Sequence, residues 1–123
     1  MIDSEYIQAV RSGNTAAFKP LVERYQQLVF RTVVGFLHHQ EEAEDLTQEI
    51  FVKIWQSLDT FSGDSTISTW IYRITVNHSL NYLRQKKRNT LFSFAEELFQ
   101  QLLNKSDEET IPEDELEARD RQI

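Results

Sequence analysis

Four side chains between residues 73 and 84 are of types that bind nucleic acid. They are Arg73, Asn77, Asn81 and Arg84, which follow one another at steps of four, four and three residues. These steps place all four on one stripe of an α-helix. Arg and Asn present hydrogen-bond donors that contact base edges or hold phosphate oxygens. The stripe is a candidate nucleic-acid surface, although a basic helix end is also ordinary on a protein with no such role.

Aromatic side chains come just before this stripe. Phe61 lies in a polar stretch around Ser62-Gly63-Asp64, and Trp70 and Tyr72 begin the helical pattern. An aromatic face can stack on an unpaired base. For Trp70 the more ordinary role is packing in the core, because it falls on an apolar position of the helix.

The charge of the chain is unevenly distributed. The net charge is −7, yet residues 71–90 carry five basic and no acidic residues. The acidic residues concentrate in 41–70 and 91–123. A polyanion responds to the local field rather than to the total charge. Net acidity therefore does not exclude nucleic acid as a partner.

A second candidate surface lies on the acidic helix expected from Glu41 to Leu58. The apolar face of this helix, which includes Trp55, is expected to be buried. The opposite face carries Asp45, Gln48, Glu49 and Val52. A solvated face is the more ordinary interpretation, but an apolar Val52 among polar neighbours favours docking of a partner.

The composition predicts an all-α fold. Only 3 Gly and 2 Pro occur in 123 residues, and apolar residues recur at spacings of three and four. We expect a compact bundle of about four helices, with a short helix over 3–11, a long one ending near Phe36, one over 41–58 and one ending near Lys87. A further helix is predicted over 93–104, followed by an acidic, partly disordered tail.

No pattern indicates an enzyme, a cofactor or a metal site. The chain lacks cysteine, and it has no phosphate-binding loop or zinc-protease motif. His38 and His39 stand near Glu41 and Glu42, but adjacent histidines on a helix point in different directions. No apolar run is long enough to span a membrane, and the N-terminus does not read as a signal peptide. We expect a cytoplasmic protein without membrane insertion.

The same residues carry a family resemblance. The run AEDLTQEIF over 43–51, then Trp55 and Phe61, TWIYRI over 69–74, and Val76-Asn77 stand at the spacing of region 2 of bacterial RNA polymerase sigma factors. Gly13-Asn14 and Ala17-Phe18 resemble the opening of that domain. The chain is most similar to the extracytoplasmic-function (ECF) subfamily over residues 3 to 90. Either motif alone is modest, and the combination is highly specific.

The resemblance implies two functional surfaces. Asp45, Gln48, Glu49 and Val52 would bind the clamp helices of the β′ subunit of core RNA polymerase. The loop from Phe61 to Thr69 would capture a base flipped out of the promoter's minus-ten element, and the helix after it would contact that element as single-stranded DNA. The implied DNA-binding residues are Phe61, Asp64, Ser65, Thr69, Trp70, Arg73, Asn77, Asn81, Arg84, Lys87 and Arg88. An anti-sigma factor is a further partner implied by the family.

The chain departs from the family in two respects. Housekeeping sigma factors carry adjacent tryptophans for melting, whereas Ile71 follows Trp70 here, as in the ECF group. Family members also carry a C-terminal helix-turn-helix domain, region 4, which is missing. We therefore expect residues 1–90 to form the region 2 domain and residues 91–123 to be an interdomain linker in a longer protein.

Two other functions remain open from the residues. The first is a helical protein-interaction module without a DNA role, which would use the acidic face and tail. The second is a DNA-binding regulator that is not a sigma factor. Binding to core polymerase and to single-stranded DNA separates all three.

Overall fold

The computed structural model describes residues 2–104, and it confirms the all-α fold. The elements are α1 (Asp3–Arg11), the 3₁₀ turn η1 (Thr15–Ala17), α2 (Phe18–Leu37), α3 (Gln40–Ser57), the 3₁₀ turn η2 (Leu58–Thr60) and α4 (Ile67–Asn104). The expected disorder of the acidic tail concerns residues from 105 on, which lie outside the described part. The chain divides into two compact units, the first ending at Leu83 and the second beginning at Arg84.

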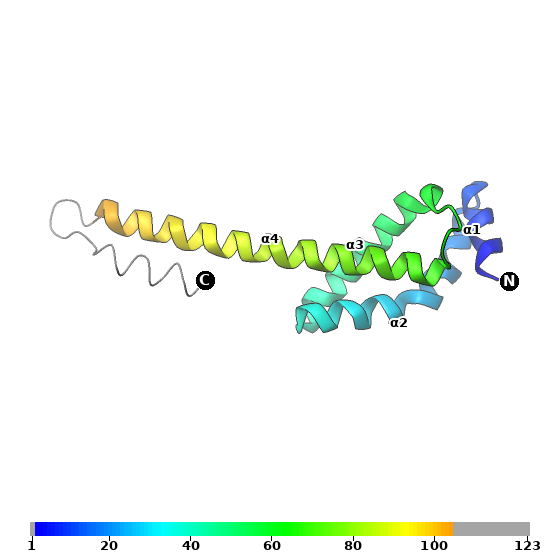
Figure 1. The fold of residues 1–123 in the computed structure, drawn as a ribbon, viewed down its shortest axis with the longest axis horizontal. Coiled ribbons are helices and arrows are strands. Elements are labelled where there is room, and N and C mark those ends of the chain that lie inside the picture. The colour runs from blue at the N-terminus through cyan, green and yellow to red at the C-terminus, as the bar shows by residue number, and fades with distance from the viewer. Residues whose placement is uncertain (1, 105–123) are drawn as a thin grey trace. The chain divides into compact units, whose positions relative to one another are not determined.

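The first unit is built on the packing of α2 against α3. The two helices lie side by side and run in opposite directions (Figure 1). His38 ends α2 in the left-handed conformation, with φ 56°, and donates its N–H to Val34 O at 2.8 Å. His39 then caps α3, because its Nδ1 accepts a hydrogen bond from the Glu42 N–H at 3.2 Å. The histidine pair thus shapes the turn, and no candidate metal cluster occurs within residues 2–104.

One apolar core joins all four helices of this unit. It includes Ile7 of α1, Leu21, Val29 and Val33 of α2, Ala43, Leu46, Ile50 and Ile54 of α3, Leu58 of η2, and Ile67 and Ile71 of α4. Burying side chains of this size stabilises a fold by roughly 1.5–3 kcal/mol each. The opposite faces of α3 and α4 are consequently left to solvent.

Helix α1 is fastened to α2 at its beginning. Asp3 accepts hydrogen bonds from the Tyr25 hydroxyl and from Arg24 Nη1. The Arg24 guanidinium also lies 5.5 Å from the centre of the Tyr6 ring, within the range of a cation–π contact. Burial, followed by the bond and charge of Asp3, raises the pKa of Tyr25 to about 12. These contacts hold the first turns of α1 against α2, and the helix ends at Arg11.

The prediction of a break after Lys87 is wrong. Helix α4 continues without interruption from Ile67 to Asn104. A basic cluster such as 84–88 suits a helix C-terminus, but residues 88–93 contain neither Gly nor Pro. The Thr90 hydroxyl donates to Lys86 O at 2.9 Å, so this polar side chain is satisfied within the helix.

The second unit, as far as it is described, is the remainder of α4 from Arg84. Its exposed apolar side chains are Leu91, Phe92, Phe99, Leu102 and Leu103. Within residues 2–104, no helix has the combination of length and apolar character that a membrane span requires.

Candidate functional site

Helix α3 exposes the face predicted to bind a partner. Asp45, Gln48, Glu49 and Val52 are all exposed, because the core takes the opposite side of the helix. Val52 is 56 % exposed although it is apolar. An exposed branched side chain among carboxylates gains free energy when a partner covers it.

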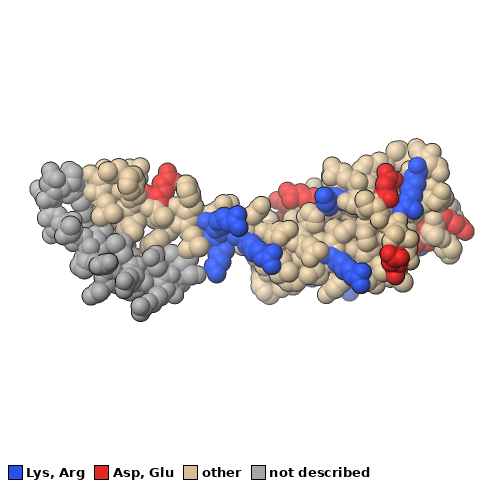
Figure 2. Space-filling view, turned by 45° about the horizontal axis from the view of Figure 1, so that its top comes forward, with Lys and Arg blue, Asp and Glu red and all other residues tan. Residues whose placement is uncertain are grey.

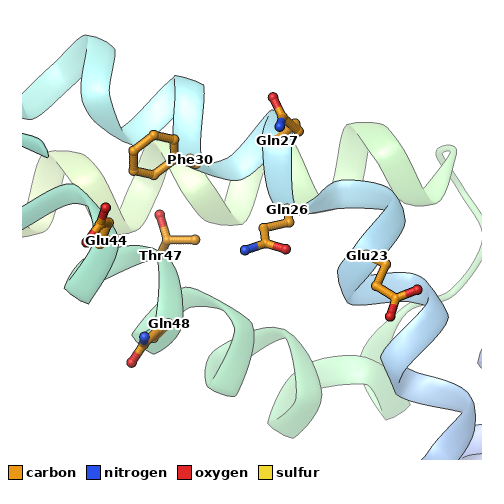
Figure 3. A pocket seen from close by; sticks show the side chains of 7 residues that line it. All are labelled: Glu23, Gln26, Gln27, Phe30, Glu44, Thr47 and Gln48. Carbon is orange, nitrogen blue, oxygen red and sulfur yellow. The ribbon is translucent and has the colours of Figure 1, made fainter.

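A groove runs between this face and α2, and sequence reasoning did not find it. Its first part is a hollow of about 500 Å³. Figure 3 shows its lining, with Gln26 of α2 and Thr47 of α3 lying in the space between the two helices. The lining residues are Glu23, Gln26, Gln27 and Phe30 from α2, and Glu44, Thr47 and Gln48 from α3. Glu23 and Glu44 make this part of the groove acidic.

The second part of the groove is a hollow of about 420 Å³, and it shares Gln26, Thr47 and Gln48 with the first. The other lining residues are Phe18, Val22, Phe51, Val52 and Trp55. The rings of Phe18 and Trp55 meet edge to face, with centroids 5.0 Å apart and an interplanar angle of 74°. This part of the groove is apolar.

Trp55 corrects one expectation. It was predicted to be buried with the apolar face of α3, yet it is 38 % exposed. The ring leans on Phe18 at the edge of the helix pair rather than entering the core. A half-open aromatic ring beside Val52 suits a partner's apolar side chain.

Thr47 lies where the two parts of the groove meet. The residue is 6 % exposed, and its Oγ1 has no hydrogen-bond partner among the described residues. A buried hydroxyl without a partner costs roughly 1–3 kcal/mol. The oxygen itself is closed to solvent, so this cost stays with the fold while the rest of Thr47 lines the groove.

The loop between η2 and α4 is held at both ends. Arg11 donates from Nε and Nη2 to Leu58 O at 3.3 and 2.8 Å, and from Nη2 to Phe61 O. At the other end, the Thr66 hydroxyl accepts from the Thr69 N–H at 3.2 Å, which caps the first turn of α4. Only residues 62–65 lie between these anchors.

Within the loop the predicted residues lie close together in the chain but differ in exposure. Asp64 and Thr69 are exposed, whereas Ser65 and Phe61 are half-buried. Asp64 Oδ2 accepts from the Ser62 hydroxyl at 2.9 Å, and Gly63 takes a φ of +84°. Glycine adopts that conformation without the strain other residues would meet.

The first half of α4 presents the predicted polar stripe. Arg73, Asn77 and Asn81 are exposed. Ile71, Thr75 and Ser79 are buried on the opposite side. Thr75 is satisfied through its bond to Ile71 O at 2.8 Å. Trp70 is half-buried against the core and against Phe61, as expected for core packing, and its stacking on a base stays a prediction.

The remaining predicted residues belong to the second unit. Arg84, Lys87 and Arg88 are exposed along α4, together with Lys86. Figure 2 shows Lys and Arg side chains gathered on this stretch of the helix. Four cations within five residues form a local positive field that attracts phosphate groups.

Arg11 and the α2 side of the groove were missed from the sequence. Arg11 donates to carbonyls 47 and 50 residues further along the chain, and no local sequence pattern predicts such a bond. Phe18 was noted for a family motif rather than for the groove. The polar residues on this side of α2 look like an ordinary solvated helix face; they are Glu23, Gln26 and Gln27.

Residues 21–89, more than half of the chain, match the family Sigma-70 region 2. Over 86 residues the chain is 38 % identical to the RNA polymerase sigma-H factor of Pseudomonas aeruginosa. The matched segment covers 70 % of this chain and 45 % of that protein. Over 83 residues it is 40 % identical to the ECF RNA polymerase sigma-E factor of Escherichia coli, covering 68 % and 43 %. The chain thus spans less than half the length of these curated relatives.

A solved structure is also similar. It is the NMR structure of an engineered region 2 of sigmaE in complex with GTAAAA. The TM-score is 0.67 at 36 % sequence identity, and the match covers 72 % of this chain and 93 % of that one.

Proposed function

Because the chain belongs to the sigma-70 region 2 family, a non-enzymatic family of transcription initiation factors, we propose that it binds core RNA polymerase through α3 and the single-stranded minus-ten element through the loop and α4. The observation that carries this proposal is the separation of the two faces. Helices α3 and α4 share one core, yet each exposes its own polar face.

Charge and shape support polymerase binding at the α2–α3 groove. Glu23 and Glu44 line its polar part, and Asp45 and Glu49 stand beside it on α3. A partner would match this surface with Lys or Arg opposite the carboxylates and an apolar side chain between Val52 and Trp55. The clamp helices of the β′ subunit are the partner that the family resemblance implies.

The loop and α4 support binding of an unpaired base. The Phe61 and Trp70 rings provide an aromatic wall, and Arg73, Asn77 and Asn81 provide donors along one stripe. A flipped base costs a few kcal/mol of lost stacking, and aromatic and polar contacts at the loop would offset that cost. The region 2 of sigmaE in the similar structure holds GTAAAA, which is consistent with this assignment.

Two variants test the two surfaces separately. Asp45→Arg combined with Gln48→Ala should abolish binding to core polymerase, because the new cation would face the partner's cations. Asn77→Ala should weaken binding to single-stranded hexamers by about tenfold, corresponding to a lost bidentate contact of 1–3 kcal/mol. Pull-down with core polymerase and fluorescence anisotropy with labelled hexamers measure the two effects.

Matched controls come from exposed residues off both faces. Glu5→Arg reverses a carboxylate on α1, and Asn14→Ala removes an amide before η1; both residues are exposed. Neither control should alter binding. The helical interaction module would be favoured if the α3 variant lost polymerase binding and the wild type bound no DNA. DNA binding without polymerase binding would favour the regulator that is not a sigma factor.

We also propose that residues 1–90 form the region 2 domain and that residues 91–123 connect it to a second domain in a longer cytoplasmic protein. The relatives extend well beyond the matched part. An open reading frame that stops after Ile123 would contradict this. An anti-sigma factor, where one exists, would compete with polymerase for the α2–α3 groove.

A further inference from the structure

We propose that Arg11, the last residue of α1, is a positioning residue for the base-binding loop. It sets the path of the chain from η2 into the loop and thereby sharpens discrimination among bases. The proposal rests on the proposed function of that loop. It adds a residue outside α3, α4 and the loop itself to the determinants of base selectivity.

The contacts of Arg11 lie where the loop begins. Leu58 O already accepts the Phe61 N–H at 3.2 Å as η2 closes, and it also accepts two donors from Arg11, at 2.8 and 3.3 Å. Phe61 O accepts the third bond. Carbonyls at a helix C-terminus have few partners within the helix, so Arg11 adds donors to Leu58 O beyond the Phe61 N–H and gives Phe61 O a partner.

The guanidinium is suited to fixing a direction as well as a distance. Its donors lie in one rigid plane, and they reach two carbonyls three residues apart. The peptide planes of Leu58 and Phe61 are therefore oriented together. The ammonium of a lysine also has three donors, but they radiate from one nitrogen, so it would fix the relative orientation of the two carbonyls less tightly.

Arg11 can transmit this constraint because α1 is itself fixed. Ile7 is buried in the core, and Asp3 is tied to Arg24 and Tyr25. At the far end of the contact, the Phe61 ring rests on Trp70. Backbone and ring of Phe61 are thus held from two sides, and the aromatic wall is placed before any base arrives. A binding site ordered in advance loses less conformational entropy on binding.

The test compares Arg11→Gln and Arg11→Lys with Arg31→Gln, a control at an exposed arginine on α2. Amide hydrogen exchange of residues 61–66 in the free protein measures loop order. Anisotropy with single-stranded GTAAAA and with hexamers substituted at each position measures discrimination. We expect Arg11→Gln to speed loop exchange and to reduce the ratio between the best and the substituted hexamers by about tenfold, because a neutral amide donates weaker bonds than the charged guanidinium does.

Arg11→Lys should fall between wild type and Arg11→Gln, and core polymerase binding should stay within about twofold of wild type for all variants. A purely structural role would instead lower both kinds of binding alike, together with Tm. If Arg11→Gln is not folded at the assay temperature, Arg11→Lys is the deciding variant. Unchanged discrimination in the folded variant overturns the Arg11 proposal alone. A wild type that discriminates among no hexamers overturns the function assigned to the loop, while the exchange data still report whether Arg11 orders it.

Discussion

The ring of Phe61, at the start of the loop, lies 5.2 Å from the ring of Trp70 in α4, with an interplanar angle of 51°. This contact links the loop to the first turn of the helix that carries the polar stripe. Both rings are half-buried, so each packs against the core and keeps part of its surface toward solvent. The pair therefore belongs to the fold and to the candidate DNA surface at once.

The Phe61–Trp70 contact should be measurable as a coupling energy. Phe61→Ala, Trp70→Ala and the double variant form a cycle, and urea unfolding measures each stability. We expect a coupling of about 0.5–1.5 kcal/mol, as for other aromatic pairs. Additive losses would mean that the two rings contribute independently. Phe18→Ala with Trp55→Ala gives a second aromatic pair, away from the loop, for comparison.

Thr47 separates stability from binding. Thr47→Val keeps the shape of the side chain and removes the unpaired hydroxyl, so the free chain should gain up to about 1 kcal/mol of stability. Under the proposed function the same change should leave binding to core polymerase within about twofold, because the hydroxyl oxygen is closed to solvent and the shape of the groove is kept. Thermal unfolding and polymerase titration measure the two effects.

Ser79→Ala is the matched control for Thr47→Val. Ser79 is fully buried, and its Oγ also has no partner among residues 2–104. Ser79 does not line the α2–α3 groove. Its removal should stabilise the fold similarly and leave polymerase binding unchanged. Weaker polymerase binding by Thr47→Val alone would show that the groove opens and exposes the Thr47 hydroxyl to the partner.

Tyr25 should make the fold sensitive to alkaline pH. Its pKa rises from 10.0 to about 12 in the folded chain, through burial first and Asp3 second. The folded state therefore retains a proton that the unfolded state releases. The stabilisation is complete below pH 10 and is lost as the pH rises through about 12.

The Tyr25 effect is measurable by urea unfolding at pH 9 and pH 11.5. We expect the wild type to lose about 1 kcal/mol more than Tyr25→Phe over this interval, a value reduced because the partly exposed ring lets solvent screen the charge. Tyr72→Phe, at an exposed tyrosine, should behave as the wild type does. Parallel losses in wild type and Tyr25→Phe would show that other groups govern the alkaline transition.

Local periodicity predicted the exposed faces well. On α3 and α4, apolar residues at spacings of three and four identified the core side, so Asp45 and Asn77 were expected at the surface, where the structure places them. The same reasoning failed after Lys87, because the basic cluster that suits a helix end lies in the middle of α4, which continues to Asn104. Periodicity also placed Trp55 in the core. It does not show how far a neighbouring helix extends, and Trp55 lies at the edge of α2.

Contacts between distant segments could not be predicted from the sequence. The groove exists because Gln26 and Thr47, from different helices, face the same space (Figure 3). Arg11 meets Leu58 only because α1 packs beside η2. Both relationships depend on tertiary packing, and a pattern within one helix carries no information about contacts with another. The candidate surfaces were therefore predicted as stripes, and the residues that shape and support them were not.

The basic residues at the start of the second unit should set the salt dependence of DNA binding. Each phosphate contact on single-stranded DNA adds about 0.7 to the slope of log affinity against log salt concentration. Lys87→Ala with Arg88→Ala should therefore lower that slope by about 1.4, and should weaken all hexamers alike, because phosphates carry no sequence information. Lys19→Ala with Lys53→Ala removes the same charge from exposed positions on α2 and α3, and it should leave the slope unchanged. An equal change in both double variants would show that net charge, rather than the location of these cations on α4, governs the attraction.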